Sequence, residues 1–397
     1  MMSSTSGTPS FHVLIVGGGG TGGALAHDLA LRGIKVTLVE RGEFTSGTTG
    51  RHHGLLHSGA RYAVNDHESA VECIEENTIL RRICPGSFEE NDGLFVAITD
   101  EDMEYHDDFL TGCAESGISA EELGPREALA MEPLLNPGLR AAVRVPDATM
   151  DAMRMPLRFF ATAKRNGADL RNYMEVLDLL VEGRTVGGAV VRDHVTGKVG
   201  EIRADVVVNA TGPWSERVAT MAGVDVPIRP SPGVMLALRG RLCNMVINRM
   251  HRSGDGDIVV PQRALSVVGT SSWTVEDPED LGVPEDHVRR MYEEGAKLIP
   301  AVANAEFRAA WSAARPLIDS TDEGNGGREL SRTFKTYDHA ATDGVEGFVT
   351  ITGGKGTTLR GMAELCADVV CRKLGVDAAC RTRDTVLLPH EAFYAAA

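Results

Sequence analysis

The chain has 397 residues, 43% of them hydrophobic and 24% charged, and it contains no low-complexity tract or fixed-period repeat. This composition is typical of a globular protein with two packed domains, and it excludes a disordered chain and a solenoid. The formal charge of -16 opposes contact with a phosphate backbone, so we expect no nucleic-acid partner.

The ends of the chain and the cysteines indicate a cytoplasmic protein. Residues 1–10 are polar and lack the parts of a secretory signal, and no apolar run is long enough to span a bilayer. We therefore expect a disordered tail at 1–10, a second tail at 386–397 and no transmembrane segment. The seven cysteines form no CxxC pair, so we expect no disulfide framework. His52, His53 and His57 have no carboxylate or cysteine at the spacing of a metal ligand, so we expect no metal site.

The first predicted element is a dinucleotide-binding unit. An unbroken apolar strand at 13–16 runs into a GxGxxG turn, a helix follows up to Arg32, and a second strand ends on Glu40. In this motif the first glycine permits the tight turn, the second lets the backbone approach a pyrophosphate, and the third lets helix and strand pack closely. A carboxylate about 20 residues later can accept hydrogen bonds from ribose hydroxyls. The predicted cofactor contacts are Gly17, Gly19, Gly22 and Glu40.

The middle of the chain contains a second strand that is expected to be buried on both faces, together with helices and strands of a separate sheet. We expect a helix at 69–83, a strand at 93–99 and a buried strand at 205–212 that ends in a glycine. Further strands are predicted at 234–240, 257–261 and 265–272, as parts of a mixed sheet. An amphipathic helix is expected at 285–299 and a turn-rich surface loop at 321–329.

A third glycine-rich strand end lies near the C-terminus. The strand at 348–354 runs into Lys355 and then a helical stretch from Met362 to Leu374. Backbone N–H groups and the positive end of a helix dipole could stabilise negative charge on a reduced flavin there. By themselves the segments at 205–212 and 348–354 could be ordinary strand-to-helix turns, and the glycine motif leaves nicotinamide and flavin dinucleotides both open.

Four segments resemble the FAD-dependent glycerol-3-phosphate dehydrogenases, and in particular the A subunits of the anaerobic type. They are TSGTTGRHHGLLHSGARYAV at 45–64, VPDATMDAMRM at 145–155, VVNATGPWS at 207–215 and TGGKGTTLRGMAE at 352–364. The resemblance runs from about Phe11 to the early 380s in the same order. It implies an α/β fold like that of D-amino-acid oxidase, in which a Rossmann-like FAD-binding domain is interleaved with an α+β substrate domain. We place the FAD-binding domain at 11–70, 145–225 and 345–385, and the substrate domain at 71–144 and 226–344.

The resemblance also implies an FAD site and a substrate site. Further cofactor contacts would be Arg41, Thr48, Thr49, Gly50, Gly212, Gly354 and Thr357. His57, Arg61 and Lys355 would act in catalysis over the isoalloxazine, and Tyr62, Arg315 and Arg332 would bind the substrate. Paired arginines suit a phosphate monoester because guanidinium groups hold it through two parallel hydrogen bonds.

The expected reaction is the FAD-dependent oxidation of sn-glycerol 3-phosphate to dihydroxyacetone phosphate, by hydride transfer to flavin N5. A neutral His57 would take the proton of the C2 hydroxyl, and Lys355 would stabilise the reduced flavin or orient the hydroxyl. Electrons would pass to a quinone or to membrane-associated partner subunits. In that case one expected location of the protein is the inner face of the cell membrane. Two alternatives are a flavoenzyme of the same fold acting on a 2-hydroxy acid or amino acid, and an FAD-holding subunit without its own turnover.

Overall fold

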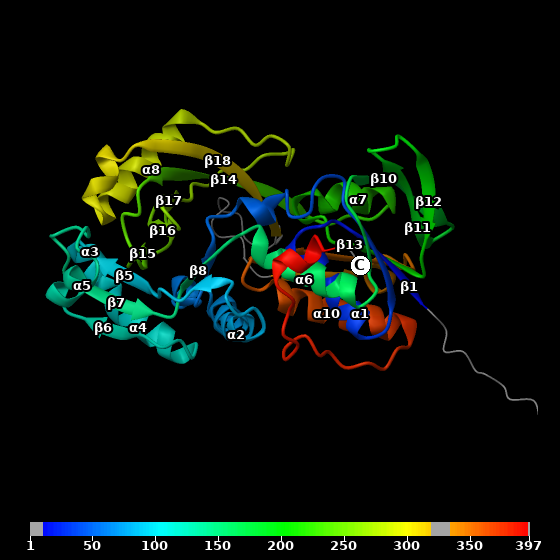
Figure 1. Cartoon of the computed structure of the whole chain (residues 1–397), viewed down its shortest axis with the longest axis horizontal. Coiled ribbons are helices and arrows are strands. Elements are labelled where there is room, and N and C mark those ends of the chain that lie inside the picture. Colours follow the sequence, from blue (N-terminus) through cyan, green and yellow to red (C-terminus); the bar gives the residue numbers. More distant parts are fainter. Residues whose placement is uncertain (1–10, 319–333, 396–397) are drawn as a thin grey trace, which may run out of the picture.

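The computed structural model describes residues 11–318 and 334–395. The predicted tail at 1–10, the predicted loop at 321–329 and Arg332 therefore lie outside the described residues. Figure 1 shows two lobes, one built on a mostly parallel sheet and one on a large mixed sheet.

The parallel sheet contains the predicted glycine-bearing strands. Its order is β19-β20-β13-β1-β2-β9, and β19 alone runs antiparallel to its neighbour. The strands are β1 (His12–Val16), β2 (Lys35–Val39), β9 (Asp169–Arg171), β13 (Val206–Asn209), β19 (Phe334–Asp338) and β20 (Phe348–Gly353). The predictions of strands at 13–16, 35–40, 205–212 and 348–354 are confirmed. Our domain borders placed β19 with the substrate domain, whereas it pairs with β20 at the edge of this sheet.

Both faces of the parallel sheet are covered, which explains why its central strands β1 and β13 carry apolar runs without alternation. Val13 and Ile15 face a core formed with α1 (Gly20–Leu31), α6 (Arg154–Arg165) and α10 (Leu359–Leu374). Leu14 and Val16 face the opposite core, which includes the antiparallel sheet of β10 (Met174–Glu182), β11 (Thr185–Asp193) and β12 (Val199–Arg203). In Figure 1, α1, α6 and α10 lie together on one side of this lobe.

The second lobe is an eight-stranded mixed sheet in the order β18-β14-β17-β16-β15-β5-β7-β6. Its strands are β5 (Gly93–Ala97), β6 (Glu121–Leu123), β7 (Ala141–Val145), β14 (Ile228–Arg239), β15 (Val246–Arg249), β16 (Ile258–Gln262), β17 (Leu265–Gly269) and β18 (Phe307–Ile318). The predicted strands at 93–99, 234–240, 257–261 and 265–272 all belong to it. The amphipathic helix α8 (Glu285–Leu298) packs Met291 and Leu298 against this sheet, as its pattern predicts.

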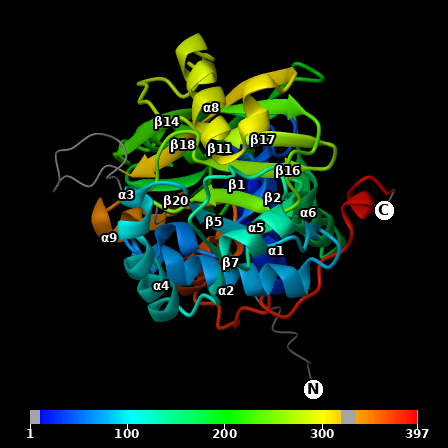
Figure 2. The same cartoon turned by 90° about the vertical axis from the view of Figure 1, so that its left-hand side faces the viewer.

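The remaining elements connect and border the two lobes. They are the helices α2 (His67–Ile83), α3 (Asp100–Glu104), α4 (His106–Glu115), α5 (Pro125–Met131), α7 (Ser215–Met221) and α9 (His339–Thr342); the strands β3 (Leu55–Leu56), β4 (Phe88–Glu89) and β8 (Ala148–Met150); and the 3-10 turns η1 (Thr48–Arg51), η2 (Ala60–Tyr62), η3 (Gly212–Trp214), η4 (Pro300–Asn304) and η5 (His390–Phe393). Figures 1 and 2 show α2 running alongside both lobes.

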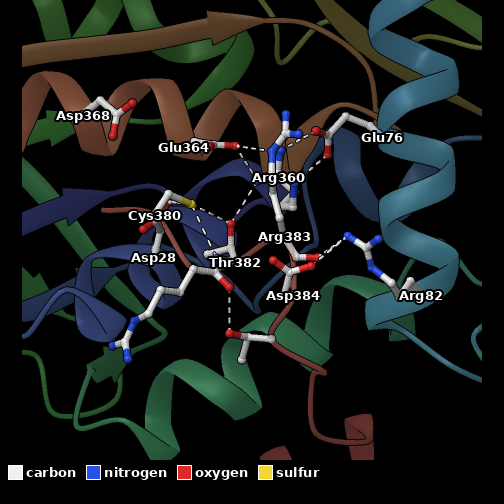
Figure 3. Close-up of polar contacts among 12 residues, drawn as sticks. Asp28, Glu76, Arg82, Arg360, Glu364, Asp368, Cys380, Thr382, Arg383 and Asp384 are labelled. Carbon is white, nitrogen blue, oxygen red and sulfur yellow. Dashed lines mark hydrogen bonds and ion pairs between the residues drawn. The ribbon is translucent and has the colours of Figure 1, made fainter. Parts of the chain in front are cut away.

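A buried network of ion pairs joins α2, α10 and the segment that follows α10 (Figure 3). The guanidinium of Arg360, whose side chain is 1% exposed, donates to Glu76 Oε2 at 2.8 Å and to Glu364 Oε2 at 2.6 Å. The same group donates to the Thr382 hydroxyl at 3.0 Å. Since a fully buried cation needs several acceptors, this network fixes α10 against α2 at the first turn of α10.

Part of the C-terminal segment 386–397, which we expected to be a tail, packs on the parallel-sheet lobe. Leu387 is buried, and its N–H donates to the carbonyl of Ile83 at 2.8 Å. The Phe393 ring meets the Phe44 ring edge to face at 5.7 Å. Isolated apolar residues in a short segment carry no periodicity, so no pattern in this stretch could signal its packing.

Candidate active site

A cavity of about 640 Å³ lies where the two lobes meet, and this volume is typical of a cofactor site. Segments from the whole chain line it: the turn after β1, residues 40–57, the loop after β13, β18 and the loop after β20. The predicted site residues along its wall are Gly17, Gly19, Glu40, Arg41, Thr48, Thr49, His57, Tyr62, Gly212, Arg315, Gly354 and Lys355. Gly22, Gly50, Arg61 and Thr357 lie outside this lining, and Arg332 is outside the described residues.

The glycine turn between β1 and α1 has the geometry that the motif requires. Gly17 has a φ of +112°, and a Cβ there would lie 2.6 Å from the carbonyl oxygen of Ala210. A Cβ on Gly22 would lie 2.0 Å from the oxygen of Gly17, so Gly22 serves the packing of helix on strand. The cavity therefore meets bare backbone and the start of α1, an arrangement that suits a pyrophosphate.

Glu40 places a carboxylate at the end of β2, beside the glycine turn. Its Oε2 accepts the N–H of Gly18 at 2.7 Å, and its Oε1 accepts the N–H of Gly42 at 2.8 Å. These bonds fix the carboxylate at the cavity wall, and each oxygen has a further lone pair for a ribose hydroxyl.

A cluster that sequence reasoning only partly found closes the cavity next to Glu40. The guanidinium of Arg41 lies 4.7 Å from the centroid of the Trp214 ring and 2.5 Å from Glu279 Oε1. The indole N–H of Trp214 donates to the same carboxylate at 2.8 Å. Glu279 lies in a surface loop, 238 residues from Arg41, and nothing in its local sequence marks it as part of a site.

The segment at 45–51 connects the glycine turn to the second lobe. The Thr49 hydroxyl accepts the N–H of Gly20 at 3.0 Å, and the Thr48 hydroxyl donates to the carbonyl of Ala314 in β18 at 2.7 Å. Gly50 lies behind the wall, where a Cβ would come within 2.5 Å of the Thr45 oxygen. This segment therefore links the first turn of α1 to the strand β18.

The HSGARY and TGGKGTT segments meet at the far end of the cavity. The backbone N–H of His57 donates to the Thr357 hydroxyl at 3.0 Å, so Thr357 fixes the backbone beneath the catalytic candidate. The His57 ring lies 5.5 Å from the Tyr62 ring and 6.1 Å from the His53 ring. The ammonium of Lys355 stands 5.2 Å from the centroid of the Tyr62 ring.

Arg315 approaches this end of the cavity from β18. Its guanidinium donates to the carbonyls of Ser231 and Ser271, each at 3.3 Å, and to the hydroxyl of Thr270. These contacts orient the Arg315 guanidinium at the cavity wall, and a planar guanidinium suits an anionic ligand.

Arg61, a predicted catalytic residue, lies behind the cavity wall in a buried ion pair with Asp257. Desolvation alone would raise the pKa of the Asp257 carboxyl, but the charge of Arg61 and hydrogen bonds from His251 and Gly254 lower it to about 2. The pair fixes the 3-10 turn that carries Tyr62. Asp257 was missed by sequence reasoning because a lone aspartate before a strand carries no signal of its partner.

Two histidines next to the predicted site also line the cavity. Burial lowers the pKa of His52 to about 4, so its imidazole is neutral near pH 7. The carbonyl of His53 accepts the amide N–H of Gln262 at 3.0 Å, which ties this segment to β16. Among residues 11–318 and 334–395, no group of three or more His, Cys, Asp or Glu side chains could hold a metal ion. All seven cysteines are free, and no described helix is long and apolar enough to cross a membrane.

Comparisons with known proteins agree with this geometry. The profile of the family described as FAD dependent oxidoreductase matches residues 12–368. The A subunit of the anaerobic glycerol-3-phosphate dehydrogenase of Escherichia coli K12 is 44% identical, over 96% of this chain and 71% of that protein. The A1 subunit of the corresponding enzyme of Haloferax volcanii is 45% identical, over 96% of this chain and 67% of that protein.

Solved structures share the fold at lower sequence identity. Glycerol-3-phosphate dehydrogenase from Bacillus halodurans, complexed with FAD, superposes with a TM-score of 0.73 and 23% identity, over 96% of this chain and 68% of that chain. Glycine oxidase from Bacillus cereus also gives a TM-score of 0.73, with 22% identity over 92% of this chain and 98% of that chain. The bare glycine backbone, the carboxylate of Glu40 and a cavity of about 640 Å³ fit an FAD molecule.

Proposed function

Since the chain belongs to the FAD-dependent oxidoreductases, and within them to the family of the A subunits of anaerobic glycerol-3-phosphate dehydrogenase, we propose that it oxidises sn-glycerol 3-phosphate to dihydroxyacetone phosphate. One observation carries the proposal: a single cavity runs from the glycine turn of a dinucleotide site to a group of cations and a histidine. On a chain with a net charge of -16, such a local group of cations favours an anionic substrate.

The chain's own residues would hold FAD at one end of this cavity. The turn at Gly17 and Gly19 and the start of α1 would face the pyrophosphate, and Glu40 would accept the ribose hydroxyls. When bound, FAD supplies the two-electron acceptor for the carbinol hydrogen of the substrate.

Arg315 would bind the phosphate of the substrate. Its guanidinium is already oriented by carbonyl and hydroxyl acceptors, which lowers the entropy lost when a ligand binds. Arg332 remains a predicted second phosphate ligand. Together they would hold the phosphate and thereby place the C2 carbon near His57, at the same end of the cavity.

His57 would take the proton of the C2 hydroxyl. Its backbone is fixed by Thr357 and its ring is packed between Tyr62 and His53, so the imidazole has a defined direction. An imidazole in its neutral form can accept a proton near physiological pH, which makes it the most suitable base on this wall. Tyr62 would shape the pocket around the carbon skeleton.

We also propose that the electrons leave through partner subunits or a quinone. The names of the relatives from Escherichia coli and Haloferax volcanii contain the word subunit, which supports a role in a larger assembly. A location at the inner face of the cell membrane would follow from such an assembly. Co-purification of the tagged chain from membranes before and after a high-salt wash measures this contact.

The test of substrate class compares two single variants, Arg315→Met and the control Arg239→Met. Arg239 lies in β14 outside the cavity, and its side chain is 70% exposed. Loss of a charged hydrogen bond to the phosphate costs about 2–3 kcal/mol, so Arg315→Met should raise KM for glycerol 3-phosphate by roughly 30- to 150-fold. Arg239→Met should leave KM unchanged. A loss of bound FAD in Arg315→Met at unchanged KM would contradict the proposed role, and faster turnover with a 2-hydroxy acid or amino acid would contradict the substrate class.

A further inference from the structure

Lys355 is held by a second element that the site described so far does not use. Its ammonium lies 3.0 Å from the Ser69 hydroxyl and 3.7 Å from Glu72 Oε2, and its side chain is only 6% exposed. Ser69 and Glu72 both belong to α2, and 286 residues separate Ser69 from Lys355 along the chain. A cation at the cavity wall is therefore paired with a carboxylate from behind the wall.

One face of α2 contacts both ends of the loop that carries Lys355. Ser69, Glu72 and Glu76 follow one another at spacings of three and four residues, so they lie on the same face of the helix. Glu76 binds Arg360 at the start of α10, while Ser69 and Glu72 contact Lys355. The position of Lys355 is thus set by α2 as well as by its own loop.

The charge of Glu72 bears directly on the charge that Lys355 presents to the cavity. Two unit charges of opposite sign about 4 Å apart near a protein surface attract each other strongly, so the Glu72 carboxylate offsets the field of the Lys355 ammonium. Burial raises the pKa of Glu72, and the charge of Lys355 acts in the opposite direction. The Glu72 side chain is 25% exposed, so water as well as the Lys355 ammonium stabilises its ionised form.

We propose that Glu72 is a positioning residue of the redox site, which holds the Lys355 ammonium against α2 and reduces the positive charge that this lysine presents to bound FAD. The inference rests on the proposed function, since it assumes that FAD occupies the cavity beside Lys355. Its consequence is that α2, through Glu72, sets part of the reduction potential of the flavin.

The experiment measures the reduction potential of bound FAD under anaerobic conditions at about pH 8, above the usual range of a carboxyl group. Glu72→Gln should stabilise reduced over oxidised flavin about tenfold, which raises the two-electron potential by about 30 mV. Lys355→Met should lower the potential. In the double variant the change from glutamate to glutamine should have less than about a third of its effect, because Glu72 acts through Lys355.

Two further variants separate this role from a structural one. Glu72→Asp keeps the carboxylate and should keep a potential close to that of the unaltered protein. Glu75→Gln removes a charge from an exposed position of the same helix and should leave the potential unchanged. A Glu72→Gln potential that is unchanged or lower, or an equal shift with and without Lys355, would overturn the inference. No substrate enters this measurement, so a failure to oxidise glycerol 3-phosphate would be seen separately.

Discussion

Replacing Arg360 by methionine tests the buried network that fixes α10 behind the site. The substitution leaves Glu76, whose side chain is 6% exposed, without its bidentate cation. Removing one partner of a buried ion pair costs about 3–5 kcal/mol, because the other charge stays buried. A chain of 397 residues unfolds with an entropy of roughly 0.8 kcal/mol/K, so the melting temperature should fall by about 4–6 °C.

Differential scanning calorimetry of the FAD-saturated protein measures this shift, with Arg383→Met as the matched control. Arg383 also contacts Glu364, at 3.4 Å, but its side chain is 51% exposed, so its loss should cost at most about 1 kcal/mol. The double variant Glu76→Met with Arg360→Met should recover part of the loss, since no unpaired charge remains at Glu76. A fall below about 1 °C for Arg360→Met, or one no larger than that of Arg383→Met, would refute the reasoning.

Three smaller predictions concern acid stability and FAD binding. Desolvation lowers the pKa of buried His27 from 6.5 to about 4, so its contribution to the free energy of unfolding should be constant above pH 6.5 and fall by about 3 kcal/mol toward pH 4. In urea unfolding, the free energy of unfolding of His27→Leu should depend less steeply on pH over this range. An unchanged slope would contradict this. Gly22→Ala should abolish FAD retention on gel filtration, because its Cβ would lie 2.0 Å from the oxygen of Gly17. The control Gly124→Ala, where a Cβ meets nothing within 4 Å, should retain FAD. Retention of FAD by both variants would contradict this prediction. Glu40→Gln should weaken FAD binding about tenfold in a fluorescence titration, because a charged acceptor for ribose hydroxyls is lost, and an unchanged affinity would exclude that contact.

The features predicted best from the sequence are those that residues close together in the chain determine, namely buried strands and the glycine turns that follow them. The strands ending near Gly17, Gly212 and Gly354 are almost wholly buried and mostly apolar because both faces of the parallel sheet are covered, and the positive φ of these glycines suits the turns that follow. From the residues alone the later two strand ends could have been ordinary strand-to-helix turns, and it was the resemblance that implied one cofactor site shared by all three. The resemblance added the positions of His57 and Lys355.

Contacts between distant segments could not be predicted, because nothing local records them. The pair of Arg61 with Asp257 spans 196 residues and the pair of Arg360 with Glu76 spans 284, and each charged residue alone is indistinguishable from a surface residue. Glu279 beside Trp214 is a further example. For the same reason the resemblance led us to expect Arg61 over the isoalloxazine, whereas its ion pair with Asp257 holds it outside the cavity lining.

The most direct test of the central claim is an anaerobic titration of the FAD-loaded protein with sn-glycerol 3-phosphate. One FAD should bind per chain, and this substrate should bleach its visible absorption, whereas glycerol without the phosphate should leave the absorption unchanged. A flavin that stays oxidised with glycerol 3-phosphate, but is reduced by a hydroxy acid or an amino acid, would contradict the account.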